Sequence, residues 1–246
     1  MKIALFSDIH ANLPAFEAAM ASIDAHKPDA VYCLGDLVGY NVWPNEVINE
    51  IRKRGIVTIG GNHDAKVGGL TEAKPAEPGK NYAYTIIEPG HKQYLATLPA
   101  YIRVEFILNN QPLNLLLVHG SPTSNTEYLL EDKEESAFLD VFKASNADIL
   151  CFGHSHKPYH RVITETTANG LHHRHAINIG SVGKPKDGDA RGCYVLLTIN
   201  SFSNTKVAES IDVEFIRVAY DVEKAAAAVE ASPLPIEFAD MLRRAY

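Results

Sequence analysis

The chain has 246 residues, 46% of them hydrophobic, and its 23 basic and 30 acidic residues give a net charge of −7. This length accommodates one α/β domain with a sizeable core, and the negative charge argues against sequence-nonspecific binding of nucleic acid. No apolar stretch approaches membrane-spanning length. The cysteines at positions 33, 151 and 193 follow no paired spacing, so we expect a reducing, cytoplasmic location.

Apolar, β-branched runs are predicted as strands, and their near-continuous hydrophobicity indicates sheets that are buried on both faces. The predicted strands are 2–8, 30–36, 55–62, 113–120, 148–156, 175–181, 192–199 and 213–220. Helical spacing of apolar residues predicts helices over 13–23, 44–54, 131–146 and 221–231, with a short final helix over 235–246.

The order of these elements indicates the fold class. Strand–helix–strand alternation in the first 60 residues predicts parallel βαβ units in an α/β fold. Strands dominate from about residue 157 onward, and we therefore expect a second sheet packed on the first. We interpret 1–246 as a single domain. Within it, 65–82 is predicted to be a mobile loop because it is rich in Gly, Pro, Lys and Glu, 65–98 is a candidate lid or insert, and 221–246 is a C-terminal helical extension.

Polar residues of only three types, Asp, Asn and His, follow five of the predicted strands. In open α/β sheets, sites form outside the carboxyl ends of the strands, and these residue types are ligands for divalent metal ions. Small neighbours such as Gly35, Gly61 and Gly153 would let the backbone approach such a cluster closely. In chain order the polar residues are Asp8, His10, Asp36, Asn62, His63, Asp64, His119, His154 and His156.

The motifs that contain these residues are "DIH" (8–10), "GD" (35–36), "GNHD" (61–64), "HG" (119–120) and "GHSH" (153–156). Together they resemble the calcineurin-like metallophosphoesterase superfamily, and more closely its small bacterial and archaeal phosphodiesterase-type branch. "NIGSVGKP" (178–185) is similar to a further family segment. The resemblance implies a four-layer metallophosphoesterase sandwich, in which two mixed β-sheets are flanked by helices.

The resemblance also implies a centre with two divalent metal ions. One ion would be held by Asp8, His10, Asp36 and His156, and the other by Asp36, Asn62, His119 and His154, with Asp36 bridging. A shared carboxylate offsets the repulsion between the two cations. Oxygen and nitrogen ligands without a thiolate leave Mn, Fe, Co, Ni or Zn open, and the resemblance favours Mn²⁺.

In such a centre a metal-bridging hydroxide is the expected nucleophile. His63 is the histidine of its motif that is left without a metal, and we expect it to act as the general acid for the leaving group. Asp64 is expected to orient His63. The alternative for Asp64 is a carboxylate that caps the turn, and it could fulfil both roles.

Near the expected bridging Asp36, this chain departs from the family pattern. Family Ser/Thr phosphatases carry an arginine four residues after the bridging aspartate, where this chain has Tyr40. Tyr40 or Trp43 could stack on an aromatic or nucleoside group, although for Trp43 packing against the following helix is favoured. Asn12 could bind a phosphate oxygen or cap the first helix. We therefore name Asn12 and Tyr40 as candidate substrate-binding residues.

Three further features suggest sites more weakly. "HHRH" (172–175) resembles a metal-binding run, but it precedes a predicted strand and is interpreted as solvated surface. "GSVGKP" (180–185) could line the site through Ser181 or backbone N–H groups, or could be a plain turn. His91 is interpreted as a surface residue at the start of an amphipathic helix.

These residues favour a dinuclear metal-dependent phosphoesterase that hydrolyses small phosphodiesters, because the arginine that would bind a monoester dianion is missing. The alternatives are a diadenosine-polyphosphate hydrolase, a nucleotide phosphomonoesterase, or a non-catalytic scaffold of the same fold. The expected partner is a small phosphoester, which could be a nucleotide, with no membrane partner. Oligomerisation is left open.

Overall fold

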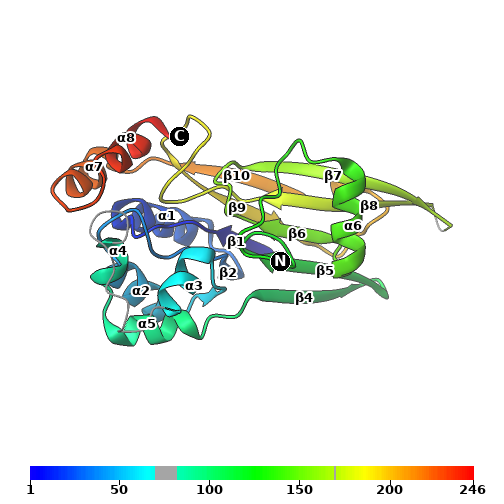
Figure 1. Cartoon of the computed structure of the whole chain (residues 1–246). Coiled ribbons are helices and arrows are strands. Elements are labelled where there is room, and N and C mark those ends of the chain that lie inside the picture. Colours follow the sequence, from blue (N-terminus) through cyan, green and yellow to red (C-terminus); the bar gives the residue numbers. More distant parts are fainter. Residues whose placement is uncertain (70–81, 169) are drawn as a thin grey trace.

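The computed structural model describes residues 1–69, 82–168 and 170–246. Two mixed five-stranded sheets pack face to face, and helices cover their outer faces (Figure 1). The first sheet has the order β10-β9-β1-β2-β3, and its strands are β1 (Lys2–Phe6), β2 (Ala30–Cys33), β3 (Val57–Thr58), β9 (Gly192–Thr198) and β10 (Asp212–Val218). The second has the order β4-β5-β6-β8-β7, and its strands are β4 (Tyr101–Leu108), β5 (Gln111–Val118), β6 (Ile149–Phe152), β7 (Tyr159–Thr167) and β8 (Gly170–Asn178).

The helices lie mainly around the first sheet, whereas α6 covers the second (Figure 1). They are α1 (Leu13–His26), α2 (Pro44–Lys53), α3 (Asn62–Gly68), α4 (Tyr82–Thr85), α5 (Pro89–Ala96), α6 (Glu135–Ser145), α7 (Val222–Glu230) and α8 (Glu237–Arg244), with a 3₁₀ turn at Ala208–Ser210. No helix in the described ranges is both long and apolar enough to cross a bilayer. The expected fold of two mixed sheets flanked by helices is confirmed.

Successive residues of a strand point to opposite faces of its sheet and so contribute to different apolar clusters. In β1, Ile3 and Leu5 face the cluster between the sheets, whereas Phe6 packs in a second cluster with Phe16 of α1. In β5, Leu117 joins the cluster between the sheets and Leu116 packs with the phenylalanines of α6 on the other face. Strands with one apolar cluster on each face require apolar residues at every position, which explains the continuous runs in the sequence.

The first sheet contains the predicted parallel units. β1 pairs in parallel with β2, and β2 pairs in parallel with β3. The carboxyl ends of these three strands therefore point the same way, and the helices that return the chain begin at that edge. β5 and β6 of the second sheet are also parallel to each other, so both sheets present strand ends from which polar residues can reach a common site.

Two strands, β4 and β7, are absent from the sequence prediction. They occupy the two edges of the second sheet, and both mix exposed with partly buried residues instead of forming a continuous buried run. The predicted loop at 65–82 is wrong over its first residues, because 65–68 continue α3. Residues 70–81 of that prediction lie outside the described residues.

The C-terminal helices α7 and α8 contact each other and form a cluster with aromatic residues that follow β2. Trp43 packs in this cluster, so it has a packing role, but with the C-terminal helices and not with the following helix that the sequence indicated. Tyr40 also joins it, and its ring centroid lies 4.9 Å from that of Phe238 in α8. The C-terminal segment thus touches the chain next to the residue that replaces the family arginine.

Candidate metal centre

The structure brings the seven residues predicted as metal ligands together at one rim, where strands of both sheets end. Each lies just after the carboxyl end of a strand, and all are buried except Asn62, which is partly exposed. Asp8 and His10 follow β1, Asp36 follows β2, Asn62 opens α3 after β3, His119 follows β5, and His154 and His156 follow β6.

Five of these residues have left-handed backbone conformations. Their φ angles are 55° for Asp8, 50° for His10, 55° for Asp36, 64° for His154 and 61° for His156. Residues with side chains rarely adopt this region, and such conformations persist at functional sites where the surrounding structure imposes them. The chain therefore turns sharply directly after three strands, and these turns direct the side chains into the rim.

Two glycines allow the backbone to approach the carboxylates. A Cβ atom on Gly61 would overlap the Asp36 carboxylate, and one on Gly153 would overlap the Asp8 carboxylate. In place of a side chain, the loops offer backbone N–H groups. His63 N donates to Asp36 Oδ1 at 2.8 Å, and His154 N donates to Asp8 Oδ2 at 3.1 Å. One oxygen of each carboxylate is thereby held, which leaves the other available for a ligand.

The protein fixes the tautomer of three histidines. Nδ1 of His10, His119 and His156 contacts a backbone carbonyl oxygen at 3.0, 2.8 and 2.6 Å, respectively. A carbonyl oxygen can only accept a hydrogen bond, so each Nδ1 carries the ring proton. In the neutral rings the lone pair is then on Nε2, the atom that is free to bind a metal ion.

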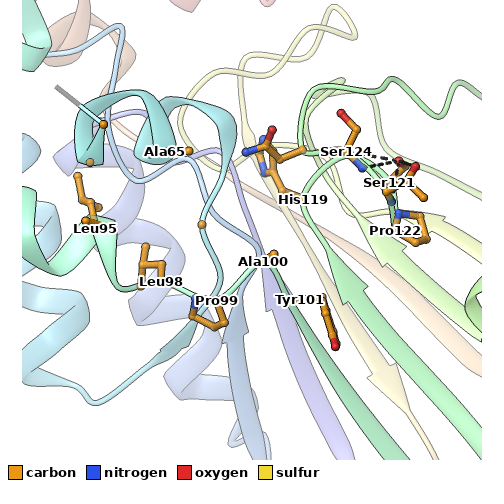
Figure 2. Close-up of a pocket in the computed structure, with 16 residues that line it drawn as sticks. Ala65, Leu95, Leu98, Pro99, Ala100, Tyr101, His119, Ser121, Pro122 and Ser124 are labelled. Atoms are coloured by element: carbon orange, nitrogen blue, oxygen red, sulfur yellow. Dashed lines mark hydrogen bonds between the residues drawn. The ribbon is translucent and has the colours of Figure 1, made fainter.

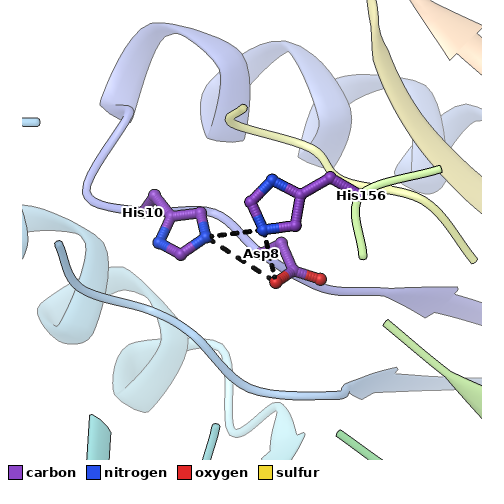
Figure 3. A group of neighbouring side chains, drawn as sticks. All are labelled: Asp8, His10 and His156. Atoms are coloured by element: carbon purple, nitrogen blue, oxygen red, sulfur yellow. Dashed lines mark hydrogen bonds and ion pairs between the residues drawn. The ribbon is translucent and has the colours of Figure 1, made fainter. Parts of the chain in front are cut away.

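The Nε2 lone pairs of His10 and His156 point toward each other and toward a carboxylate oxygen of Asp8. His10 Nε2 and His156 Nε2 are 3.1 Å apart and lie 3.6 and 3.1 Å from Asp8 Oδ1 (Figure 3). In the described part of the chain, Asp8 Oδ1 is buried without a hydrogen-bond partner. Acceptors that face one another at such distances repel unless a cation lies between them. The donor set therefore fits a bound metal ion.

A second group of donors repeats this arrangement. Donor atoms of Asp36, His119 and His154 lie within 4.8 Å of one another, as do those of Asp8, His10 and His156. Asn62 adjoins the second group, because its Oδ1 atom lies 3.1 Å from His119 Nε2. Asp36 Oδ2 is 3.3 Å from His119 Nε2 and 3.7 Å from His10 Nε2, so this carboxylate stands between the two groups. That is the place of a bridging ligand.

The electrostatics also favour bound cations. Burial alone would raise the pKa of Asp8 and of Asp36, but the surrounding histidines hold the pKa of both carboxyl groups below its ordinary value. Burial lowers the pKa of His10 to about 3, which keeps its ring neutral. At His119 the Asp36 and Asp8 carboxylates outweigh burial and raise the pKa to about 10. Ionised carboxylates thus create a potential that attracts positive charge.

His63 lies beside this centre, with its ring centroid 5.0 Å from that of His10. Its Nδ1 atom contacts the Tyr84 hydroxyl at 2.6 Å. Burial lowers the pKa of His63, whereas the carboxylates of Asp36 and Asp8 act in the opposite direction. A donor atom of His63 also lies within 4.8 Å of donors of His10 and Asp36. The ring is therefore close enough to exchange a proton with a group bound at the centre.

The expectation that Asp64 orients His63 is wrong, because the Asp64 carboxylate faces backbone amides. Its Oδ2 atom accepts from Asp36 N at 2.7 Å and from Gly61 N at 3.0 Å, and Oδ1 accepts from Leu37 N at 3.0 Å. This is the turn-capping alternative, and it fixes the backbone of Asp36. Burial, followed by the Asp36 charge, raises the pKa of Asp64 to about 7.

The two candidate substrate-binding residues differ in their surroundings. Asn12 is fully buried, and its side chain accepts from Ala15 N as the helix cap and donates to Gly183 O at 2.8 Å. The expectation that Asn12 binds a phosphate is therefore wrong. The Tyr40 ring lies beside the centre, 4.8 Å from the His10 ring and 5.0 Å from the His63 ring. Tyr40 can contact a substrate there.

The structure also decides three weaker interpretations. His91 is buried and its ring nitrogens contact Asn45 Oδ1 and Asn49 Oδ1, so the surface interpretation is wrong. His175, the last residue of "HHRH", is also buried. Ser181 donates to Asp8 O at 2.8 Å and is fully buried, so "GSVGKP" supports the ligand backbone through this residue and does not present it to a substrate.

Three residues beside the centre were missed by sequence reasoning, namely Tyr84, Lys184 and Lys186. Lys184 is 2% exposed, and its Nζ atom lies 4.8 Å from the Tyr40 ring centroid. Burial lowers the pKa of Lys184 to about 8. The Asp8 and Asp36 carboxylates raise the pKa of Lys186, although burial outweighs them. The "GSVGKP" motif (180–185) pointed to this loop, but to its serine and not to its lysines.

A cavity of about 420 Å³ adjoins the centre at His119. Figure 2 shows the His119 ring between the small residues of the 65–100 side and the loop that carries Ser121, Pro122 and Ser124. The described residues that line it are all uncharged apart from His119 itself, and Tyr101 lies at its end. A pocket of this size accommodates a small organic group next to a metal-bound phosphate.

Comparisons with known proteins agree with the geometry. The sequence profile of the calcineurin-like phosphoesterase superfamily domain matches residues 1–201. An uncharacterized protein, MJ0912 of Methanocaldococcus jannaschii, is 30% identical over 249 residues, which cover 95% of this chain and 93% of that protein.

Two crystal structures resemble the whole chain. A metallophosphoesterase from Sphaerobacter thermophilus has a TM-score of 0.77 and 28% identity, covering 100% of this chain and 99% of that one. The hypothetical protein PH1004 from Pyrococcus horikoshii OT3 has the same fold, with a TM-score of 0.77 and 22% identity, covering 100% and 98%.

The chain therefore belongs to the calcineurin-like phosphoesterase superfamily. The class of protein that the fold and the site define is a metallophosphoesterase, a hydrolase of phosphoric esters that binds divalent metal ions through clustered histidines and aspartates. The family membership gives the fold and the class of chemistry. The donor groups at Asp8, Asp36 and their histidines could hold the metal ions that this chemistry uses.

Proposed function

We propose that the protein is a dinuclear metal-dependent phosphodiesterase that acts on small phosphodiesters in the cytoplasm. The observation that carries the proposal is the convergence of the His10 and His156 lone pairs on the buried Asp8 carboxylate, an arrangement that a bound cation would stabilise. The location in a reducing compartment is supported by three cysteines that are all unpaired.

The ligand groups divide between two ions. Asp8, His10 and His156 would hold the first, Asn62, His119 and His154 the second, and Asp36 both. Oxygen and imidazole donors without a thiolate leave Mn, Fe, Co, Ni or Zn open, and Mn²⁺ is proposed on the resemblance to the family. When bound, the ions supply an activated water as nucleophile and compensate the charge of the phosphate oxygens.

His63 is proposed to donate a proton to the leaving oxygen as the phosphorus–oxygen bond breaks. In the protonated ring, Nδ1–H donates to the Tyr84 oxygen 2.6 Å away, which leaves Nε2–H as the proton to be transferred. Asp64 contributes indirectly, because it fixes the backbone of Asp36 between the two ligand groups. Tyr40 is proposed to contact the leaving group, since its ring lies 5.0 Å from that of His63.

The uncharged cavity beside His119 favours a diester over a monoester. A diester carries a second organic group on phosphorus, and the cavity offers about 420 Å³ for it next to a ligand of the second ion. A diadenosine-polyphosphate hydrolase or a nucleotide phosphomonoesterase is the second candidate. Lys184 and Lys186, two cations beside the centre, support a more strongly charged substrate.

The test is an assay of Mn²⁺-loaded protein with bis(p-nitrophenyl) phosphate and p-nitrophenyl phosphate, followed by a nucleotide panel. We expect turnover of the diester to exceed that of the monoester and to depend on His63. If the loaded protein hydrolyses none of these esters, or if His63→Ala equals the wild type, the proposed mechanism is wrong. Preference for a nucleotide monoester or a dinucleoside polyphosphate would select the second candidate.

A further inference from the structure

The loop that contains Lys184 and Lys186 is hydrogen-bonded to two of the candidate metal ligands, Asp8 and His156. Gly183 N donates to Asp8 O at 3.0 Å, and Lys186 N donates to His156 O at 3.2 Å. His156 Nδ1 in turn donates to Lys184 O at 2.6 Å. Three hydrogen bonds therefore fix the backbone of both lysines relative to the centre, and their side chains begin at defined positions beside it.

The ammonium group of Lys184 is buried without an anion. The residue is 2% exposed, and its Nζ atom lies over the Tyr40 ring, 4.8 Å from the centroid. Among the residues that the structure describes, no carboxylate lies within ion-pair distance of it. Contact with an aromatic face recovers less free energy than an ion loses when it leaves water. The fold thus maintains an unpaired buried charge at this position.

Lys186 adds a second charge of the same sign. Its side chain is partly buried, it also has no ion-pair partner within the described ranges, and it opposes the charge of Lys184. Lys186 is close enough to Asp8 and Asp36 to experience their negative charge. With metal ions bound at those carboxylates, the two lysines and the metals together would form a region of net positive charge.

We propose that Lys184 and Lys186 form a phosphate-binding site beside the metal centre and bind phosphate oxygens of the substrate. The inference rests on the proposed phosphoesterase function and names the residues that replace the guanidinium missing at Tyr40. Tyr40 would position Lys184, because the Lys184 ammonium group lies over its ring. The same ring also contacts the rings of His10 and His63. The bound phosphate supplies the counterion that the two ammonium groups lack.

The first experiment measures binding of inorganic phosphate by calorimetry to the metal-loaded full chain. We compare the wild type with Lys184→Gln, Lys186→Gln and the double variant, and we measure metal content in each. A charge-assisted hydrogen bond contributes about 1.5–3 kcal/mol, so each single variant should lose roughly 10-fold to 100-fold in phosphate affinity at unchanged metal content. Lys186→Arg should retain binding, because it keeps the charge.

The matched control is Lys53→Gln. It removes the same charge from the exposed end of α2, where the Lys53 side chain is 79% exposed, and it should leave phosphate affinity unchanged. Phosphate affinity of the double variant equal to that of the wild type, at full metal content, overturns the proposal. Phosphate binding that depends on the lysines in a protein that hydrolyses no ester would reject the proposed function but keep the site.

Substrate kinetics then distinguish two sources of the bound phosphate. If the lysines hold the phosphate that is cleaved, Lys186→Gln raises KM for bis(p-nitrophenyl) phosphate by about 10-fold or more. If they hold a second phosphate of the same substrate, KM for that ester stays constant and KM rises only for nucleotides with an additional phosphate. Either result supports the phosphate site and identifies which group occupies it.

A stability measurement distinguishes a phosphate-binding role of Lys184 from a purely structural one. Lys184→Met removes an unpaired buried charge and keeps the length of the side chain, so we expect the thermal midpoint of the metal-loaded protein to rise while phosphate affinity falls. A structural lysine would show the reverse, with a lower midpoint and unchanged phosphate affinity. If Lys184→Met fails to fold, Lys186→Gln provides the same phosphate comparison at a partly exposed position.

Discussion

Two groups of histidines in this molecule show how surroundings determine what a residue does. The rim of the sandwich holds His10, His119, His154 and His156 among carboxylates. The paired strands β7 and β8 hold a second group, in which His160 Nε2 contacts His175 Nδ1 at 3.0 Å and His173 Nδ1 contacts Thr164 Oγ1 at 2.9 Å. Both groups include buried rings. In the strands a buried carboxylate, that of Asp148, contacts His172, but among the described residues only the rim histidines converge with carboxylates in groups of three or more donors.

The difference appears in the titration of comparable rings. At the rim, Asp36 and Asp8 outweigh burial and raise the pKa of His119 to about 10. In the strands, burial together with the neighbouring His160 and His173 lowers the pKa of His175 to about 3. The backbone differs as well, because five of the seven rim residues adopt left-handed conformations while His175 keeps the regular pairing of β8. In this chain, the histidines that fit a metal site are those that converge with carboxylates at strand ends.

The largest effect should come from the shared carboxylate of the rim. Asp36→Asn removes the charge that stands between the two ligand groups, and we expect loss of bound metal and a decrease in turnover of at least about 10⁴-fold. Metal content by mass spectrometry and diester hydrolysis measure both effects.

The matched control for that change is Asp148→Asn. Asp148 Oδ1 contacts His172 Nε2 at 3.0 Å, so this substitution removes a carboxylate from the strand histidines instead of the rim. Its metal content should equal that of the wild type. Equal loss of metal in both variants would contradict the distinction between the two groups.

The next largest effects should differ between two adjacent rim residues, His63 and Asn62. His63→Ala should lower kcat by about 10²–10⁴-fold with both metals retained, because His63 is proposed to transfer a proton and not to hold an ion. Asn62→Ala should lower metal affinity instead, since Asn62 adjoins His119 in the second ligand group. Metal titration followed by assay at saturating metal resolves the two. An empty centre in His63→Ala would show that this ring is a ligand.

The strand histidine His175 should make the free energy of unfolding decrease at acidic pH. The folded state holds His175 at a pKa of about 3 against an ordinary 6.5, so the unfolded chain binds more protons between these values and acid destabilises the fold. From pH 6.5 to pH 5 the loss from this residue is about 2 kcal/mol. His175→Leu should remove that part of the pH dependence in chemical denaturation. A variant with the same acid sensitivity as the wild type would show that the ring is solvated.

The smallest effect concerns the partner of His63. Tyr84→Phe removes the oxygen that accepts from the protonated ring, which lowers the pKa of His63 and weakens its positioning. We expect kcat to fall by about 3–10-fold at neutral pH and the descending limb of the pH–rate profile to move to lower pH. Metal content should stay constant. A profile that keeps its shape would reduce Tyr84 to a packing residue.

The ligand positions and the first sheet were accessible from the sequence because they depend on short-range patterns. A buried parallel strand is a continuous apolar run, and the first polar residues after it, such as Asp8 or Asp36, must lie near its carboxyl end. The same criterion does not detect β4 and β7, because they are edge strands in which exposed residues interrupt the apolar pattern.

The residues that hydrogen-bond to the candidate site could not be predicted from the sequence, because their positions depend on packing between distant segments. Asp64 bonds to Asp36 N from 28 positions further along the chain, and Tyr84 reaches His63 from a separate helix. The burial of Lys184 depends on how its loop folds over the ligand turns. Spacing within a motif gives no information on any of these contacts, which arise only when both sheets are assembled.

The left-handed backbone at five candidate ligands has a thermodynamic consequence. Glycine adopts this conformation without strain, whereas most residues with a side chain are strained there. The five side chains therefore stand at positions where backbone conformation alone would favour glycine. The fold accepts this strain where its carboxylate and imidazole donors converge.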